Sequence, residues 1–490
     1  MKKLLTLSVV LIFCLSHLYS TMLKTKHETN NILILSGELS PNSIILQCRL
    51  NKSDKLINSD IPGVKGNTCF QISTDSTFKD YIKTKWQECT NQNDYITKIK
   101  VDGLQSETTY FYRAQALISG SSDTVYSKIG TFSTLPPTTS EKEMKFAMSS
   151  GFHYEKFYGF GHYLKKKKNP LLEPAKGIDS ILGFEAFDAV REMDLDFFIA
   201  NGDVVYYDHP RKMPVKTKPQ LNAKWHRYFA MPRNRDMCLQ LPVYYLKDDH
   251  DHRFNDCDTT NIIKSEPSSQ LGIQVFKEQV PVTDPADDKA VTYRTYKMGK
   301  HLQLWFVEGR DYRSPNNAKD TLDKTIWGEE QKRWLKETLL ESNARFKILV
   351  SPTPMVGPDD IRKTDNHTNV GGFQTEGNEF FQWLKENDFD TNEFFIICGD
   401  RHWQYHSIHP YGYEEFSGGA FINQNSRKGK APGNKNSTDP DGLITSPFMQ
   451  IKETGGGFLV VNTHMEKNIP VIRFSFHDIH GKERYATVKK

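Results

Sequence analysis

Cysteine is scarce in this 490-residue sequence, and no two cysteines are spaced as Cys-x-x-Cys. That absence excludes a zinc ribbon and a thioredoxin-type redox site. No segment after Ser20 is long or apolar enough to span a membrane. Neither sign of charge dominates, because 64 Lys and Arg stand against 60 Asp and Glu and leave a formal charge of +4. So small an excess does not indicate nucleic acid as the main partner.

The rest of the composition is that of a globular protein. Hydrophobic residues make up 37% and charged residues 25% of the chain, with 31 Gly and 23 Pro. These proportions exclude a disordered, collagenous or coiled-coil protein. The length predicts two or three domains with enough chain for a sizeable core.

The first residues have the pattern of a secretory leader. Met1–Lys3 is basic, Leu4–Leu15 carries no charge, and small or polar residues follow as far as Ser20. Because the apolar run is shorter than the ~20 residues of a membrane span, we expect residues 1–20 to be a signal peptide. An uncleaved N-terminal anchor is the alternative. The expected location is therefore periplasmic, cell-surface or secreted.

An exported protein can contain disulfides, so the remaining cysteines bear on its architecture. Cys238 and Cys257 flank the most unusual segment of the sequence. Either they form a bridge that stiffens this segment, or they are reduced, buried thiols. The cysteines after Cys14 are Cys48, Cys69, Cys89, Cys238, Cys257 and Cys398.

Residues 31–136 have the pattern of an all-β sandwich. Short apolar runs such as Ser43–Cys48 and Thr97–Val101 are separated by Asn, Gly and Ser. Within this region, Val101–Leu104 and Thr108–Arg113 resemble the tyrosine-corner region of fibronectin type III domains. Residues 134–140 are rich in Pro and Thr, which is typical of a linker.

Strand and helix patterns alternate in residues 145–490. This alternation predicts an α/β layer architecture, in which ligands gather at the carboxyl ends of the strands. The predicted strands are Lys145–Met148, Asp196–Ala200, Phe346–Val350 and Phe394–Cys398, and the predicted helices are Ile181–Met193, Glu329–Glu341 and Glu376–Asn387.

Acidic and imidazole side chains follow three of the strand patterns, and Gly202 and Gly399 permit tight turns there. Converging carboxylates repel one another unless cations neutralise them, so we expect a pair of metal ions ~4 Å apart that ionises a bound water. Asp and His without a nearby thiolate favour Fe, Mn, Ca or Mg over a structural zinc. The three segments are Asn201–His209, Tyr244–His252 and Cys398–His402.

Together these motifs resemble the alkaline phosphatase D (PhoD-like) branch of the calcineurin-like metallophosphoesterases. The resemblance covers nearly the whole chain after the leader. It implies a four-layer α/β/β/α metallophosphatase sandwich, with two mixed sheets between helices, preceded by the small β-sandwich. The motifs that carry it are Gly202–Asp203 with Tyr206, Asp248–Asp251 with Asn255, Val307–Arg313 and Gly399–His402.

The same resemblance assigns roles to the metal ligands. It implies that Asp203 bridges two metals and that Tyr206 donates a phenolate to the iron-like one. Asp249 would occupy a ligand position, and Asp400 and His402 would complete the two coordination shells. The implied cofactors are two or more metal ions, Fe and Ca first, with Mn, Mg or Zn as alternatives.

The end of the first strand of the α/β region departs from the family pattern. Residues 149–154 lack the Cys, or the Asp-x-His of broader relatives, that binds the first metal. His153 could supply the missing ligand, or Ser150 could occupy the Cys position. A His153 satisfied by hydrogen bonds within its loop is the alternative.

The resemblance implies hydrolysis of a phosphate monoester or diester by a metal-bound hydroxide. Arg310 or Arg313 would hold the phosphate through a bidentate fork, with a surface ion pair as the alternative for either. His250 would protonate the leaving alkoxide or orient the substrate, with Asp251 or a backbone group fixing its tautomer. The expected partner is a phosphorylated small molecule or a phosphodiester, without specific recognition of nucleic acid.

Two other functions compete with this one. The first is hydrolysis of another anionic ester, such as a sulfate. The second is non-catalytic binding of a surface glycan with a decayed metal site, which the altered Ser149–Gly151 segment favours and the retained Asp and His positions oppose.

Two further loops invite an interpretation. Lys165–Lys168 is more typical of a solvated loop than of an anion site. Asp365–Phe373 has the composition of a lid over a cleft, in which His367 is exposed or faces the substrate.

Overall fold

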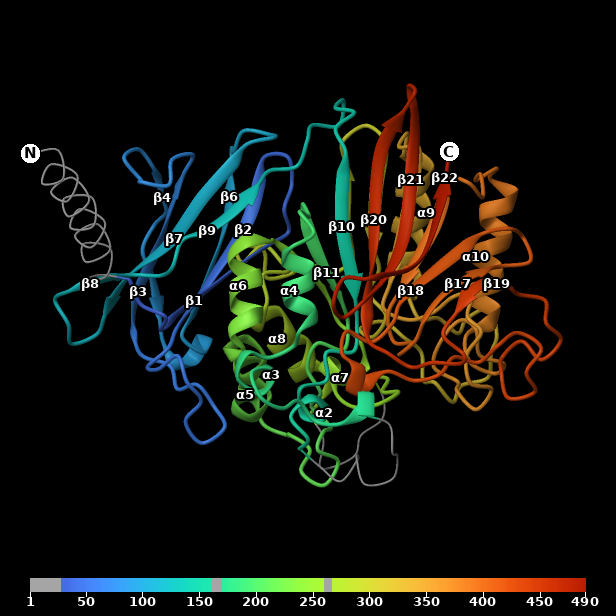
Figure 1. Cartoon of the computed structure of the whole chain (residues 1–490), viewed down its shortest axis with the longest axis horizontal. Helices are drawn as coiled ribbons and strands as arrows, with labels where there is room; N and C mark the ends of the chain where they lie inside the picture. The colour runs from blue at the N-terminus through green and yellow to red at the C-terminus, as the bar shows by residue number, and fades with distance from the viewer. Residues whose placement is uncertain (1–27, 161–169, 260–266) are drawn as a thin grey trace, which may run out of the picture.

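The computed structural model describes residues 28–160, 170–259 and 267–490 (Figure 1). The predicted leader and the run Lys165–Lys168 lie outside these ranges. Among the helices of the described residues, none combines the length and the apolar character needed to cross a membrane.

Strands β1 to β9 form the all-β region at the left of Figure 1, as the sequence predicts. In β7, buried side chains alternate with more exposed ones, the pattern of a strand with one face in a core. One sheet contains β1 (Ile32–Gly37), β2 (Ser43–Leu50) and β6 (Ile96–Asp102). The other contains β3 (Gly66–Ser73), β4 (Ile82–Lys83), β5 (Gln87–Cys89), β7 (Thr109–Ile118), β8 (Thr124–Tyr126) and β9 (Gly130–Ser133), and η1 (Asn91–Asn93) precedes β6.

Two mixed sheets form the larger part of the molecule. The first contains β12 (Val243–Leu246), β11 (Phe197–Asn201), β10 (Met144–Ser149), β20 (Gly457–Glu466), β21 (Ile469–Asp478) and β22 (Glu483–Lys489), in that order, with β10, β11 and β12 parallel. The second contains β13 (Arg294–Met298), β14 (Leu302–Phe306), β15 (Phe346–Ser351), β16 (Phe394–Cys398), β18 (Glu414–Gly418), β17 (Gln404–Ile408) and β19 (Thr445–Met449), with β14, β15, β16 and β18 parallel.

Helices cover the outer face of each sheet, so the layers run α/β/β/α (Figure 1). The first sheet packs against α4 (Ala186–Arg191), α5 (Lys218–Ala230), α6 (Pro232–Gln240) and α8 (Ser269–Gln279). The second packs against α9 (Gly328–Glu341) and α10 (Gln374–Glu386). The short helices are α2 (Tyr154–Phe157), α3 (Asp179–Leu182), α7 (Asp249–His252), η3 (Pro170–Leu172) and η4 (Asn423–Asn425). The predicted four-layer fold is confirmed.

Successive side chains of a strand point to opposite faces of its sheet. Each central strand therefore contributes residues to two cores, one on either face. In β10, Phe146 and Met148 belong to the core between the two sheets, whereas Ala147 packs under the helices. Parallel strands covered on both sides contain continuous apolar runs, which is how they are recognised in the sequence.

The structure corrects one sequence expectation and decides between two alternatives for another feature. The predicted helix Ile181–Met193 is two helices, α3 and α4, because Gly183 adopts φ +93 between them. A Cβ atom at Gly183 would lie 2.7 Å from that of Met231. Cys238 and Cys257 are free and buried, so of the two alternatives for this pair the reduced, buried thiols hold and the bridge does not.

The carboxyl ends of the parallel strands meet at the lower edge of the molecule in Figure 1, beside α2 and α7. The two sheets touch there. Asn201 at the end of β11 donates from Nδ2 to the Ser351 carbonyl at the end of β15, at 2.9 Å. Gly399 after β16 lies so close to β11 that a Cβ atom would be 2.3 Å from the Asn201 carbonyl oxygen. Residues that follow strands of different sheets are thereby brought into one site.

Candidate metal centre

Strand β11 delivers Asp203 into the site through a left-handed turn. Gly202 and Asp203 have φ values of +76 and +56, and a Cβ atom at Gly202 would lie 2.6 Å from that of Asp248. The carboxylate of Asp203 is buried, and its Oδ1 atom has no hydrogen-bond partner in the described part of the chain. Burial raises the pKa of Asp203 well above its usual range, and the charge of Asp249 adds to that shift while His250 opposes it.

Tyr206 lies between Asp203 and η4. Its hydroxyl donates to Asp203 Oδ2 at 2.9 Å and accepts from Asn425 Nδ2 at 3.0 Å. Burial and the Asp203 carboxylate raise the pKa of Tyr206 well above its usual range. A phenolate at Tyr206 therefore requires a cation beside it.

The altered segment after β10 lies against Tyr206. The rings of His153 and Tyr206 stack with centroids 3.8 Å apart. His153 Nδ1 accepts from the Lys156 amide at 3.3 Å, whereas its buried Nε2 has no hydrogen-bond partner among the described residues. The Ser150 hydroxyl donates to the Gly419 carbonyl at 3.3 Å. Of the two predicted replacements for the family cysteine, His153 is the one whose ligand atom has no hydrogen bond among the described residues.

The acidic run after β12 folds into the first turn of α7. Asp251 accepts from the Asp248 amide at 2.6 Å through Oδ1 and from the Val204 amide at 3.0 Å through Oδ2, so it fixes the backbone of both strand ends. Asp249 accepts from the Asp256 amide at 2.6 Å, which turns its carboxylate toward the site.

Asp208, a residue without a predicted role, orients His250. Its Oδ1 atom lies 2.7 Å from His250 Nδ1, so the suggestion that Asp251 fixes this ring is wrong. Burial lowers the pKa of His250, but the charges of Asp208 and Asp249 outweigh it and raise the pKa to about 10. The sequence feature that could have identified Asp208 is its position after β11, in the same segment as Asp203.

The described residues contain three groups of side chains whose ligand atoms lie within 4.8 Å of one another. The predicted residues Asp203, Asp249 and His250 form one of them. Asp365 belongs to another, and its buried carboxylate lacks a hydrogen-bond partner within the described ranges. The remaining groups are Asp208 with His209 and His250, and Asp249 with Asp256 and Asp365.

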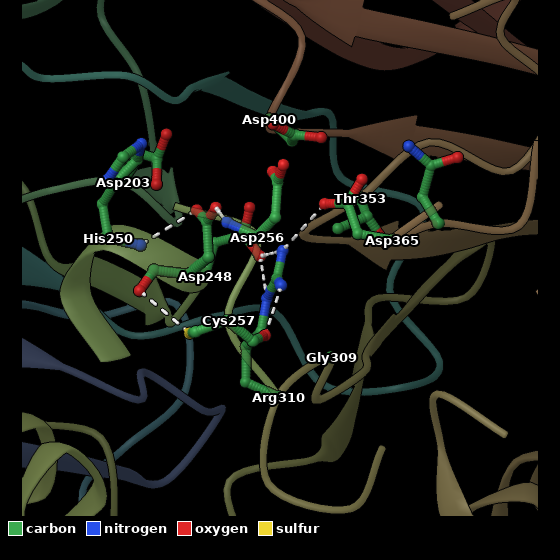
Figure 2. Close-up of polar contacts among 12 residues, drawn as sticks. Asp203, Asp248, His250, Asp256, Cys257, Gly309, Arg310, Thr353, Asp365 and Asp400 are labelled. Carbon is green, nitrogen blue, oxygen red and sulfur yellow. Dashed lines mark hydrogen bonds and ion pairs between the residues drawn. The ribbon is translucent and has the colours of Figure 1, made fainter. Parts of the chain in front are cut away.

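Residues after β16 border the centre from the second sheet. His402 Nε2 lies 3.6 Å from Asp203 Oδ2, and burial lowers the pKa of His402 well below its usual range. Asp400, with φ +56, pairs with the neighbouring guanidinium of Arg401. Figure 2 shows the Asp400 carboxylate across the centre from Arg310. Asp400 therefore borders the site and lies outside the three close groups of the described residues.

Both predicted phosphate-binding arginines are buried. Arg310 donates to Asp248 Oδ1 at 2.7 Å and to the Cys257 carbonyl at 3.0 Å (Figure 2). Arg313 donates to the Gly309 carbonyl at 2.7 Å and to the Asp365 carbonyl at 3.0 Å. Their contact with a substrate stays a prediction, but neither forms the surface ion pair considered as the alternative.

The lid interpretation of Asp365–Phe373 is wrong for its first half. Asp365, His367 and Asn369 are buried, and His367 Nε2 lies 2.9 Å from Glu376 Oε2 on α10. His367 is therefore neither exposed nor directed at a substrate.

The donor set fits hard or borderline cations. Carboxylate and imidazole atoms of Asp203, Asp365 and His153 that have no hydrogen-bond partner among the described residues lie where several carboxylates crowd together. The nearby thiol of Cys257 donates to the Asp249 carbonyl at 3.4 Å, and burial raises the pKa of Cys257 to about 12, so it remains protonated. These residues could hold two or more cations.

Comparison with known proteins agrees with this geometry. Alkaline phosphatase D of Bacillus subtilis (strain 168) is 19% identical over 467 residues, which cover 87% of this chain and 74% of that protein. A solved structure of PhoD superposes with a TM-score of 0.70 at 16% identity, covering 94% of this chain and 88% of that one. Purple acid phosphatase PPD1 from yellow lupin (Lupinus luteus) seeds superposes with a TM-score of 0.60 at 11% identity, covering 94% and 73%.

Two family models match the sequence. Residues 22–136 match the N-terminal domain of PhoD-like phosphatases, and residues 146–426 match the PhoD-like phosphatase domain itself. The second match covers more than half of the chain. The chain therefore belongs to the PhoD-like phosphatase family and is a phosphoric ester hydrolase.

Proposed function

We propose that this chain is an exported phosphoesterase that hydrolyses phosphate monoesters or diesters with two or more bound metal ions, Fe and Ca first. The observation that carries the metal dependence is the convergence of Asp203, Asp249 and His250 in a buried site. Taking charged carboxylates out of water costs several kcal/mol per ion unless partners compensate, so the arrangement calls for cations. The leader pattern in residues 1–20 supports export.

The cations, when bound, would supply positive charge that lowers the pKa of a water molecule and offsets charge developing on the phosphate oxygens. The residues proposed to hold them are Asp203, Tyr206, Asp249, Asp400 and His402, with His153 at the altered strand end and Asp256 and Asp365 beside Asp249.

His250 is proposed as the proton donor to the leaving alkoxide. Its Nδ1 atom is engaged by Asp208, so Nε2 is the atom that would transfer the proton. In the metal-free protein, burial lowers the pKa of His250 and the carboxylates around the ring outweigh it, raising the pKa to about 10. Arg310 pairs with the Asp248 carboxylate, and Arg313 donates to the Asp365 carbonyl. Both guanidinium groups would stabilise the nearby acidic side chains as well as an incoming phosphate.

Replacement of Asp203 by Asn tests the metal-dependent part of the proposal. The expected result is loss of metal, measured by elemental analysis, together with loss of turnover on a phosphomonoester and a phosphodiester. Asp288→Asn changes an exposed carboxylate in the same way and is expected to alter neither. A D203N protein that keeps its metal and its full rate contradicts the proposed role.

The same preparations decide between ester classes. A wild-type protein that hydrolyses a sulfate ester in preference to both phosphate esters contradicts the substrate assignment. Secretion is tested separately, by following a full-length chain and a chain lacking residues 1–20 in the medium, the envelope and the cytoplasm.

A further inference from the structure

A mainly apolar pocket lies where the β-sandwich meets the loops that follow β10 and β11. Its volume is about 580 Å³. Leu56 enters from the sandwich, Tyr154 and Phe160 from α2 and the residues after it, and Pro210 and Met213 from the loop after β11. A cavity of this size accommodates an organic group of ten or more heavy atoms.

The apolar side chains of this pocket are unusually exposed. Leu56 is 40%, Phe160 51% and Met213 70% exposed, although each is a large hydrophobic residue. Single exposed apolar residues are ordinary, but several around one hollow are typical of a binding site. The apolar wall therefore calls for an apolar occupant.

The pocket and the metal centre are built from neighbouring residues of two segments. Pro210 directly follows His209, whose ring centroid lies 5.4 Å from that of His250. Helix α2 connects the two sites from the other side, because Tyr154 lines the pocket while the preceding His153 stacks on Tyr206. The loop after β11 and helix α2 therefore each contribute a residue to the pocket and the preceding residue to the surroundings of the centre.

The charges around the pocket favour an anionic ligand with an apolar part. Glu155 in its wall is neutralised by the buried ammonium of Lys224. Lys212 and Arg227 also line the pocket, and the Arg227 guanidinium lies 5.9 Å above the Tyr154 ring. Cations at the rim attract a negatively charged ester, whereas the aromatic and aliphatic wall gains nothing from a polyol.

We propose that this pocket binds the apolar organic group of the ester whose phosphorus lies at the metal centre. The inference rests on the proposed function and narrows it to phosphate esters of aryl or alkyl alcohols. Because Leu56 belongs to the N-terminal sandwich, this region takes part in substrate selection.

The test uses full-length, metal-loaded protein and a series of alkylphosphonates from methyl to hexyl, with binding measured by calorimetry. Each CH₂ group buried in the pocket is expected to tighten binding about fourfold. The KM for alkyl p-nitrophenyl phosphates is expected to fall along the same series. Leu56→Ser and Met213→Ser are each expected to lower the hexyl-to-methyl affinity ratio by about tenfold while leaving methylphosphonate binding unchanged.

Ile82→Ser is the matched control, because Ile82 is 49% exposed on β4 of the same sandwich and lies outside the pocket. An affinity ratio that does not depend on chain length, or that both pocket variants leave unchanged, overturns the inference. If the proposed function is wrong, no ester is turned over. The phosphonate titration still measures binding in the pocket, so the two failures can be told apart. If the pocket variants instead lose binding to phosphatidylglycerol vesicles and keep the wild-type ester ratio, the patch is a lipid-binding surface and the inference is wrong.

Discussion

A single carboxylate oxygen, Oδ1 of Asp208, lies 2.7 Å from Nδ1 of His250 and 2.9 Å from Nδ1 of His209. Asp208 thereby fixes the orientation of two imidazole rings on one side of the centre. Because a ring held at Nδ1 presents Nε2 on its opposite side, the tautomer and the direction of His250 depend on this contact.

Asp208→Asn keeps the shape of this side chain and removes its charge. We expect kcat to fall by about 10- to 100-fold, the usual effect of losing a partner that orients a functional histidine. The metal content should stay at the wild-type value. A parallel loss of metal and activity would show that Asp208 is a ligand rather than an orienting group.

The same variant changes the pH dependence of the metal-free protein. The folded pKa of His250, about 10, exceeds the ordinary value of ~6.5, so this group contributes stability that is present below pH ~6.5 and lost as the pH rises through 10. Without Asp208 the pKa falls and the loss of stability between pH 7 and 10 becomes smaller. Guanidinium unfolding of the wild type and of D208N at pH 7 and pH 10 measures how much stability each protein loses. An equal loss in the two proteins would contradict the prediction.

His153→Ala tests the altered strand end. If Nε2 is the missing ligand, the variant should bind one metal ion fewer per chain and lose turnover while remaining folded. His464→Ala, on β20 and paired with Glu466, is the control for loss of an imidazole elsewhere. Unchanged metal content would mean that His153 serves only to pack against Tyr206.

The contact between the β-sandwich and α5 contains buried charges. His226 lies with Nδ1 2.6 Å from Asp60 and Nε2 2.6 Å from Asp94, and Arg49 pairs with Asp94 at 3.1 Å. Burial alone would raise the pKa of Asp94, but His226 and Arg49 outweigh it and lower that pKa well below its usual range. This cluster of charges therefore contributes to stability only while Asp94 is ionised.

Asp94→Asn leaves the Arg49 guanidinium without its carboxylate and removes one of the two carboxylates beside His226, and we expect about 3–5 kcal/mol less stability at pH 7. Because the folded pKa is lowered, this contribution is present above the unfolded value of ~3.9 and is lost as the pH falls through the folded one. The difference between wild type and variant should therefore shrink in acid. Asp123→Asn removes an exposed carboxylate of the same sandwich and should change neither the stability at pH 7 nor its dependence on pH.

Gly399→Ala tests the close approach of the two sheets. The added Cβ atom would lie 2.3 Å from the Asn201 carbonyl oxygen and 2.8 Å from that of Pro352, so the backbone must move, at a cost of about 1–3 kcal/mol or more. Gly309→Ala is the matched control at another strand end, because its Cβ atom would meet Pro352 only at 3.6 Å. Similar unfolding midpoints for the two variants would show that the sheets separate easily here.

Local patterns predicted several central strands and flanking helices and part of the site. Strands β10, β11, β15 and β16 were recognisable because burial on both faces requires continuous apolar runs. Asp203 and Asp249 were recognisable because each follows such a strand, and the carboxyl ends of parallel strands share one edge. The break in the helix at Gly183 was missed. The helical spacing of apolar residues continues past Gly183, although the backbone there leaves the helical conformation.

What the sequence determined by itself is the order of strands and helices and the identity of the residues that follow each strand, since both depend on neighbours along the chain. Only the tertiary structure decided which of these side chains meet. Asp208 reaches His250, Arg310 turns inward to Asp248, and Asp365 joins Asp249, because two stacked sheets set those distances. The physical reason is that hydrophobic periodicity selects a buried face, whereas the direction of a polar side chain depends on partners from distant segments.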